Sequence, residues 1–164
     1  MPRGCRSDLP DGIYHVTGRG TGGIYVFMDD VDRARFTVLL REAAQQFDLQ
    51  LIAWCLLGTH FHLIVDSRRE QLSRAMHRLN GLYAQRFNNR HARRGHLFEE
   101  RFSSWVIETE EHLHRAIEYV IENPVAAGLC SRPEEWIWSW PRLDSPSFSD
   151  IRGTVPGTWS ELAG

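Results

Sequence analysis

Two histidines separated by one residue are the first side chains in this sequence that could do chemistry. His60 and His62 lie in GTHFHLIV (58–65), directly after the equally apolar LIAWCLL (51–57). Alternate side chains of a β-strand share a face, so both imidazoles point the same way and Phe61 points to the other face. Such a pair can hold a metal ion through two nitrogens. The alternative is a hydrogen-bonded pair on a solvent-facing sheet surface, and the spacing alone leaves both open.

A tyrosine and an asparagine in EHLHRAIEYVIENP (111–124) could complete such a site. At about 100° per residue, Tyr119 lies roughly 120° and Asn123 roughly 80° from the centre of the apolar stripe, on the same side. As i and i+4 neighbours they can converge on one object. The stripe consists of Leu113, Ala116, Ile117, Val120 and Ile121. A tyrosine placed for packing would lie in the stripe, as Tyr83 does on its own helix, so Tyr119 is a candidate nucleophile. His112, one heptad earlier, points in a similar direction.

The elements that must position these side chains follow from hydrophobic periodicity, which predicts the order strand, helix, strand, strand, helix, strand, helix. The expected strands lie within residues 13–28, 50–57, 60–66 and 96–107, and the expected helices span about 30–47, 70–89 and 110–122. This order favours an α+β fold, a ferredoxin-like antiparallel sheet with helices on one face.

Local signals set the expected ends and inner faces of the helices. Asp29 and Asp30 can cap the first helix, Thr109 can cap the last, and Pro124 should end it. The predicted inner face of the first helix consists of Val31, Ala34, Val38, Leu39 and Ala43. That of the second consists of Leu72, Met76, Leu79, Tyr83 and Phe87.

Length and composition indicate a cytoplasmic protein with one domain of ordinary size. The 164 residues contain no apolar run near the ~20 residues of a membrane span and no signal-peptide core. The three cysteines are scattered, as is typical of a reducing compartment. We expect a domain over residues 1–130 and a Trp- and Pro-rich tail over 131–164, partly ordered by Trp136, Trp138, Trp140 and Trp159 and packed on the domain.

Positive charge is concentrated in the middle of the chain, although the net charge is −2. Between residues 68 and 101 there are nine arginines and three glutamates, and the chain has no lysine. Arginine binds phosphate through two parallel hydrogen bonds. The candidate DNA-binding residues are Arg74, Arg78, Arg86, Arg90, Arg93 and Arg94, with Arg19 and His15 as weaker candidates. The alternative is a solvated helix face.

Four segments in order resemble the single-tyrosine HUH transposases, and more closely the bacterial REP-associated tyrosine transposases. They are YHVTGRG (14–20), AWCLLGTHFHLIV (53–65), LNGLYAQRFNNRHARRGHLFEERF (79–102) and EYVIENPVAAGL (118–129). One departure is Thr21-Gly22-Gly23, where many relatives carry Asn and further basic residues.

The resemblance implies roles for particular residues. His60, His62 and Asn123 would bind Mg²⁺ or Mn²⁺, and Tyr119 would attack single-stranded DNA, often beside a hairpin, to give a 5′-phosphotyrosine and a free 3′-OH. His112 is the candidate base. Ligand chemistry alone would favour Mn²⁺, Ni²⁺ or Zn²⁺, because Mg²⁺ prefers oxygen. The protein would work as a monomer or homodimer at a bacterial nucleoid.

Two other functions remain open at this point. A non-catalytic binder of hairpin DNA or RNA would use the arginines and need none of the four site residues. A metal-dependent phosphodiesterase would use water as the nucleophile and Tyr119 only for packing. A covalent protein–DNA adduct distinguishes the transposase from both.

Overall fold

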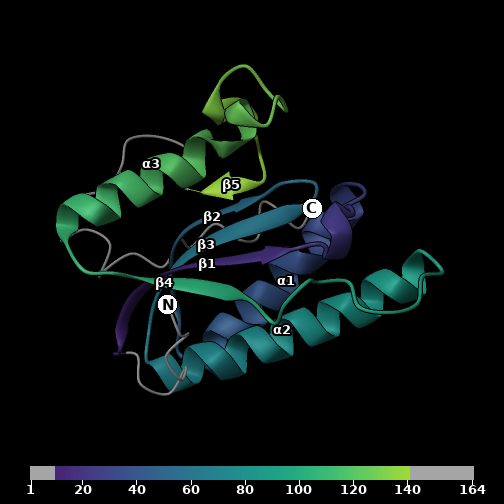
Figure 1. Ribbon diagram of the computed structural model, residues 1–164, viewed down its shortest axis with the longest axis horizontal. Coiled ribbons are helices and arrows are strands. Elements are labelled where there is room, and N and C mark those ends of the chain that lie inside the picture. Colours follow the sequence, from purple (N-terminus) through teal and green to yellow (C-terminus); the bar gives the residue numbers. More distant parts are fainter. Residues whose placement is uncertain (1–9, 141–164) are drawn as a thin grey trace.

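One antiparallel sheet with the strand order β4-β1-β3-β2-β5 forms the centre of the structure, a computed structural model that describes residues 10–140 (Figure 1). The strands are β1 (Gly12–Arg19), β2 (Gln50–Leu56), β3 (His60–Ser67), β4 (Ser103–Ile107) and β5 (Ser139–Trp140). The helices are α1 (Asp30–Gln46), α2 (Arg69–Arg90) and α3 (Glu110–Ala126), with 3₁₀ turns at Thr21–Gly23 and Pro133–Glu135. The predicted α+β, ferredoxin-like class is confirmed. None of the helices in the described region is long and apolar enough to cross a membrane.

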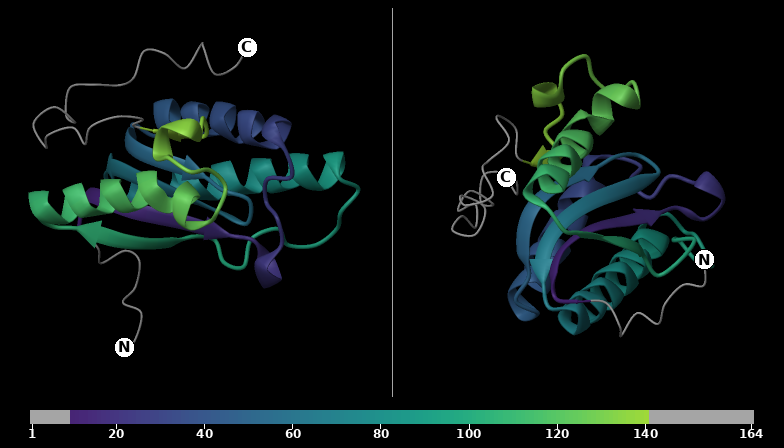
Figure 2. Two further views of the ribbon diagram at one scale, coloured as in Figure 1. Left: turned by 90° about the horizontal axis from the view of Figure 1, so that it is seen from above. Right: turned by 60° about the vertical axis from the view of Figure 1, so that its left-hand side comes forward.

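Helices cover both faces of the sheet, so the expectation of helices on one face was wrong (Figure 2). Helices α1 and α2 pack on one face, and α3 packs mainly on β2 and β3 from the other. The reason lies in β2, which is apolar on both sides: Trp54 and Leu56 join the α1–α2 core, whereas Ala53 and Cys55 join the α3 core. A strand that is buried on both faces needs a cover on each.

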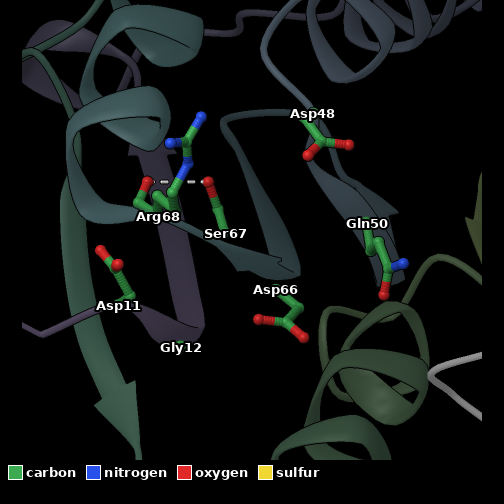
Figure 3. A pocket seen from close by; sticks show the side chains of 7 residues that line it. All are labelled: Asp11, Gly12, Asp48, Gln50, Asp66, Ser67 and Arg68. Carbon is green, nitrogen blue, oxygen red and sulfur yellow. Dashed lines mark hydrogen bonds between the residues drawn. The ribbon is translucent and has the colours of Figure 1, made fainter.

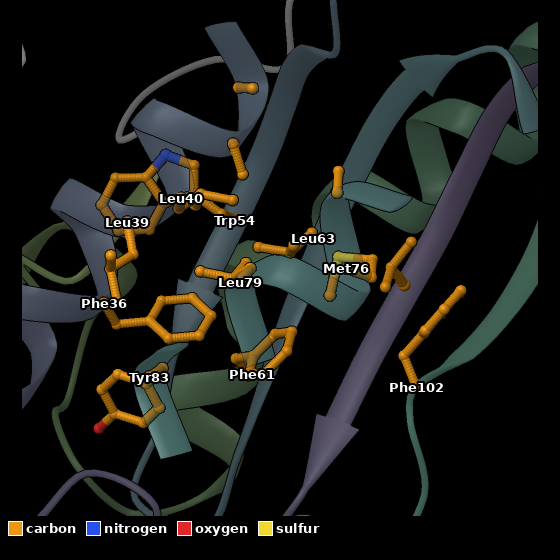
Figure 4. Close-up of a cluster of buried hydrophobic side chains, with 14 of the residues drawn as sticks. Phe36, Leu39, Leu40, Trp54, Phe61, Leu63, Met76, Leu79, Tyr83 and Phe102 are labelled. Atoms are coloured by element: carbon orange, nitrogen blue, oxygen red, sulfur yellow. The ribbon is translucent and has the colours of Figure 1, made fainter. Parts of the chain in front are cut away.

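The larger core lies between the sheet and the pair α1–α2 (Figure 4). Phe61 of β3 and Tyr83 of α2 flank Phe36 of α1, with ring centroids 4.7 and 5.1 Å from the Phe36 ring. The Tyr83 hydroxyl donates a hydrogen bond to the Val26 carbonyl, so this buried ring is satisfied. The predicted inner face of α2 is confirmed, since all five of its residues are buried.

The predicted inner face of α1 was only partly right. Leu39 and Ala43 are buried, but Val31 and Val38 are 48% and 43% exposed. The side of the helix that faces the core carries Phe36, Leu39 and Leu40. Val31 and Val38 lie roughly on the opposite side, because an α-helix has 3.6 residues per turn. Asp29 caps α1 as expected and accepts a hydrogen bond from the Asp32 amide.

Helix α3 does not end before Pro124 as predicted but continues to Ala126. The stop signal is Gly128, which has a φ of 74°. The Gly128 amide donates to the Val125 carbonyl, and the Leu129 amide donates to the Pro124 carbonyl. This pair of bonds is the Schellman motif, which satisfies the last carbonyls of a helix. Pro124 is therefore accommodated within the final turn.

Two segments differ from their expected structure: residues 96–107 were expected to be extended throughout, and the segment after residue 130 was expected to be irregular. Within residues 96–107, only Ser103–Ile107 is a strand, and Phe98 forms an isolated bridge with Gly20. Beyond α3, Ser139–Trp140 adds β5 to the edge of β2. Trp138 is buried and donates from its indole nitrogen to Asp30. The rest of the predicted tail, including Trp159, lies outside the described residues.

The space around two glycines, Gly18 of β1 and Gly81 of α2, predicts opposite effects of substitution by alanine. A Cβ on Gly18 would lie 2.4 Å from the ring of the fully buried Phe61, whereas a Cβ on Gly81 of α2 would meet nothing within 4 Å. We expect Gly18→Ala to lower the free energy of unfolding by about 1–3 kcal/mol. The matched Gly81→Ala should raise it by about 0.5–1 kcal/mol, because alanine favours the helix. Urea unfolding measures both, and an unchanged Gly18→Ala protein would contradict the packing.

Candidate active site

The two histidines of β3 lie on the sheet face that α3 covers. In the pairing of β1 with β3, Thr17 lies opposite His62 and Arg19 lies opposite His60. The ring centroids of His60 and His62 are 5.1 Å apart. The predicted common face is therefore present, and it is not a free solvent surface: His62 is only 5% exposed.

Each histidine has its Nδ1 atom engaged by a neighbouring side chain. His15 Nε2 lies 3.0 Å from His62 Nδ1, and Thr59 Oγ1 lies 3.0 Å from His60 Nδ1. In both rings Nε2 remains for a ligand. One ring nitrogen fixed by a partner and the other directed at the site is the usual arrangement of metal-binding histidines. The sequence predicts His15 only as a weaker DNA contact and indicates no role for Thr59.

The three imidazoles are held neutral. Burial lowers the pKa of His15 to about 4, that of His60 to about 4 and that of His62 to about 3. The charge of Arg19 adds to the lowering at His60 and His62, and that of His112 adds to it at His15. A neutral imidazole keeps the lone pair that a metal needs.

Helix α3 brings Tyr119 and Asn123 to the histidines. Its stripe of Leu113, Ala116, Ile117 and Val120 is buried in the α3 core. Asn123 Nδ2 lies 3.4 Å from His62 Nε2, the nitrogen that remains for a ligand. The Tyr119 ring lies 5.5 Å from that of His62 and 6.0 Å from that of His15. Tyr119 is nevertheless 55% exposed, so a macromolecular substrate could reach its hydroxyl.

The arginines predicted to bind DNA fall into groups that differ in position. Arg19 is exposed on the histidine face, opposite His60. Arg74, Arg78 and Arg86 are exposed on α2, which covers the other face of the sheet. The structure thus separates the helix arginines from Tyr119 by the whole sheet. Arg74 also lies over the Phe47 ring, 5.5 Å from its centre.

The arginines at the end of α2 differ in what they contact. Arg90 forms ion pairs of 2.7 Å with Asp29 and 2.8 Å with the buried Asp32, which tie α2 to the start of α1. Arg93 donates to Asn88 and to two backbone carbonyls of its own loop. Arg94 is exposed and makes no ion pair within residues 10–140. Arg90 and Arg93 thus have structural partners that the charge pattern could not reveal.

A hollow of about 400 Å³ lies at the opposite end of the strands from His60 (Figure 3). Its lining residues are Asp11, Gly12, Asp48, Gln50, Asp66, Ser67 and Arg68. Three carboxylates against one guanidinium make it unsuited to phosphate. It is therefore not the site that the histidines and Tyr119 form.

The fold and the site define a class of DNA-acting proteins, in which an inner strand of a ferredoxin-like sheet carries His-hydrophobe-His and a facing helix carries a tyrosine. Residues 12–123 match the family of IS200-like transposases, and the chain belongs to this family. The expected family resemblance is thereby confirmed at this level.

Two solved structures are similar to the chain, and the first of them shares its fold. A REP-associated tyrosine transposase bound to a REP hairpin has a TM-score of 0.64 and 16% identity, over 91% of this chain and 96% of that one. A candidate transposase from Deinococcus radiodurans R1 has a TM-score of 0.48 and 22% identity, over 75% of this chain and 95% of that one. No curated protein sequence matches the chain.

The neutral imidazoles predict a loss of stability on acidification of the metal-free protein. The unfolded chain takes up protons near pH 6.5, whereas folded His15, His60 and His62 take them up only at about 4, 4 and 3. Between these values the unfolded state binds more protons, so the free energy of unfolding falls as pH falls from 7 to 4.

Urea unfolding at several pH values, with a chelator present, measures this slope. His62→Gln removes one of the three buried imidazoles and should reduce the difference in bound protons between the unfolded and folded states by up to one, which lowers the slope. Equal slopes in the wild type and His62→Gln would show that His62 titrates normally when folded.

Proposed function

We propose that this chain cuts and rejoins single-stranded DNA through a covalent bond between Tyr119 and a 5′-phosphate. The observation that carries the proposal is the convergence of three residues, from β1 and α3, on His62. His15 of β1 lies 3.0 Å from one ring nitrogen, Asn123 of α3 lies 3.4 Å from the other, and the exposed Tyr119 ring lies 5.5 Å away. Neither a pure binder nor a packing role for Tyr119 requires this arrangement.

The residues present fit a divalent metal ion, for which we propose Mg²⁺ or Mn²⁺. His60 and His62 would supply Nε2, and Asn123 would supply its amide oxygen after the amide turns over, since its two ends exchange by a simple rotation. Within residues 10–140 no three His, Cys, Asp or Glu side chains form a metal cluster, so a third ligand for this pair has to be another group. When bound, the ion would neutralise charge on the scissile phosphate and stabilise the leaving oxygen.

Tyr119 supplies the nucleophile. Its phenolic oxygen forms a bond to phosphorus, the bond from phosphorus to the 3′-oxygen breaks, and the 3′-oxygen leaves as a 3′-OH with a proton from solvent. The reverse reaction with the 3′-OH of another strand rejoins the DNA and frees Tyr119. The phosphodiester energy is kept in the phosphotyrosine, so rejoining needs no external energy source.

The tyrosine proton needs an acceptor, because a free phenol titrates near pH ~10. The Tyr119 hydroxyl makes no hydrogen bond to another residue in the described part of the chain, so it is accessible to solvent. His112 is our candidate base. It lies on the same helix, one heptad before Tyr119, and so points in a similar direction.

We propose hairpin-flanking single-stranded DNA as the substrate. The similar transposase structure was bound to a REP hairpin. Arg19 is our candidate for a phosphate contact near the histidines, because it lies opposite His60 on the same face. The other exposed arginines could contact only DNA that is further from the histidines and passes around the edge of the sheet or the loop after α2. They are Arg74, Arg78, Arg86 and Arg94.

Substitution of Tyr119 tests the covalent chemistry. Wild-type protein with Mn²⁺ and labelled single strands from hairpin repeats flanking its gene should give a labelled band at the mass of protein plus DNA on a denaturing gel. Tyr119→Phe and His60→Ala should reduce this band to background. Tyr25→Phe is the matched control, because Tyr25 is equally exposed at 60%, and it should keep the wild-type yield.

Each other outcome selects a different function. Cleaved DNA without an adduct would make the protein a hydrolase in which water attacks. Tight binding with neither cleavage nor adduct, across several substrates and metals, would make it a DNA-binding protein that has lost catalysis.

Removal of Asn123 tests the metal site independently of DNA. Asn123→Ala leaves two protein ligands, so its Mn²⁺ affinity should fall by at least about tenfold. Asn89→Ala removes an exposed amide at the end of α2 and should not change the affinity. Titration followed by the electron paramagnetic resonance signal of free Mn²⁺ measures both, and equal affinities would exclude Asn123 as a ligand.

A further inference from the structure

The sheet face that carries the histidines is only partly covered: Ile13 of β1 and Ile107 of β4 are buried in the α3 core, but the residues further along these two strands are not. Helix α3 packs mainly on β2 and β3, while β1 and β4 form the other side of the sheet (Figure 2). On this open part, residues of β1 and β4 lie opposite one another: His15 faces Trp105, and Thr17 faces Ser103. All four are exposed or half-buried, so this part of the face is open beside the site.

Trp105 is exposed in a way that packing does not explain. Its side chain is 54% exposed and belongs to neither core cluster, whereas Trp54 and Trp138 are 1% and 5% exposed. The Trp105 indole nitrogen makes no hydrogen bond to another residue in the region from 10 to 140. Tryptophan is enriched at interfaces, because one end of its ring is apolar and the other can hydrogen-bond, so an exposed tryptophan next to the site is a candidate contact for a ligand.

The position of Trp105 links it to the reacting groups. Its ring centroid lies 5.7 Å from that of His15, which in turn lies 6.0 Å from that of Tyr119. Arg19, also on β1 and on the same face, adds positive charge at the His60 end. An aromatic ring near a phosphate-attacking tyrosine, with a cationic side chain further along the neighbouring strand, suits a nucleotide whose base is unpaired.

We infer that Trp105 is a stacking platform for an unpaired DNA base next to the phosphate that Tyr119 attacks. The inference rests on the proposed function for the position of that base. Stacking of this base would hold the backbone in place while Tyr119 reacts. Because every base has a flat face, the platform tolerates different sequences, and the loss of any base at this position should weaken binding.

Binding by protein that cannot cut tests the platform. In the full-length Tyr119→Phe background, affinity is measured for a single strand in which each nucleotide in turn is made abasic. One abasic position should weaken binding by about 5- to 150-fold. Trp105→Ala should weaken binding to intact DNA by the same factor and show no further loss at that position. Trp105→Phe should retain most of the affinity.

The controls separate stacking from other effects. His77→Ala removes an exposed ring from α2 on the far side of the molecule and should leave the abasic profile unchanged. Thermal unfolding should show that Trp105→Ala is folded, because the removed ring is half exposed. An abasic penalty that persists in Trp105→Ala, or the absence of any penalty, would overturn the inference.

Two further results distinguish this inference from the proposed function. An adduct in wild type together with normal DNA binding by Trp105→Ala would overturn the platform and leave the chemistry intact. Coupling between Trp105 and one base without any adduct would support the platform and refute the chemistry. Conversion of a dimer to a monomer by Trp105→Ala, at unchanged DNA affinity, would assign the ring to contact between two copies and overturn the platform.

Discussion

The pairing of β1 with β3 is the constraint on which the rest of the site depends. Its register sets Arg19 opposite His60 and Thr17 opposite His62, so that His15 reaches His62 diagonally across the two strands. A shift of one residue would turn every one of these side chains to the other face. The register is fixed because the opposite face is the larger core, where Phe61 lies against Gly18 and only a glycine leaves room for the ring.

The same pairing explains how polar groups persist in a buried position. His62 is almost inaccessible, and a buried polar side chain is costly unless its hydrogen bonds are made. His15 engages its Nδ1 atom from β1, and Asn123 of α3 lies 3.4 Å from its Nε2 atom, the nitrogen that would bind the metal. Burial then keeps the ring uncharged, which suits a metal ligand. Stability and the proposed chemistry thus depend on the same contacts.

The helices on the two faces of the sheet have different roles: α1 and α2 support the sheet, whereas α3 contributes residues to the site. Helices α1 and α2 are joined by the ion pairs of Arg90 with Asp29 and Asp32, and they form a rigid support away from the site. Helix α3 packs mainly on β2 and β3, so Tyr119 projects from its flank beside the less covered parts of β1 and β4. Partial cover is what allows a buried metal site and an accessible nucleophile to lie side by side.

The order of the first strands and helices, the common face of His60 and His62, and the position of Tyr119 and Asn123 beside the apolar stripe of their helix could all be predicted from the sequence. These follow from local periodicity, which a single segment contains in full. Tertiary structure decided that α3 crosses to the second face, that His15 contacts His62, that Arg90 is an ion-pair residue and that Trp105 is exposed beside the site. Each of these depends on which strands pair and in what register, and residues far apart in the chain settle that together.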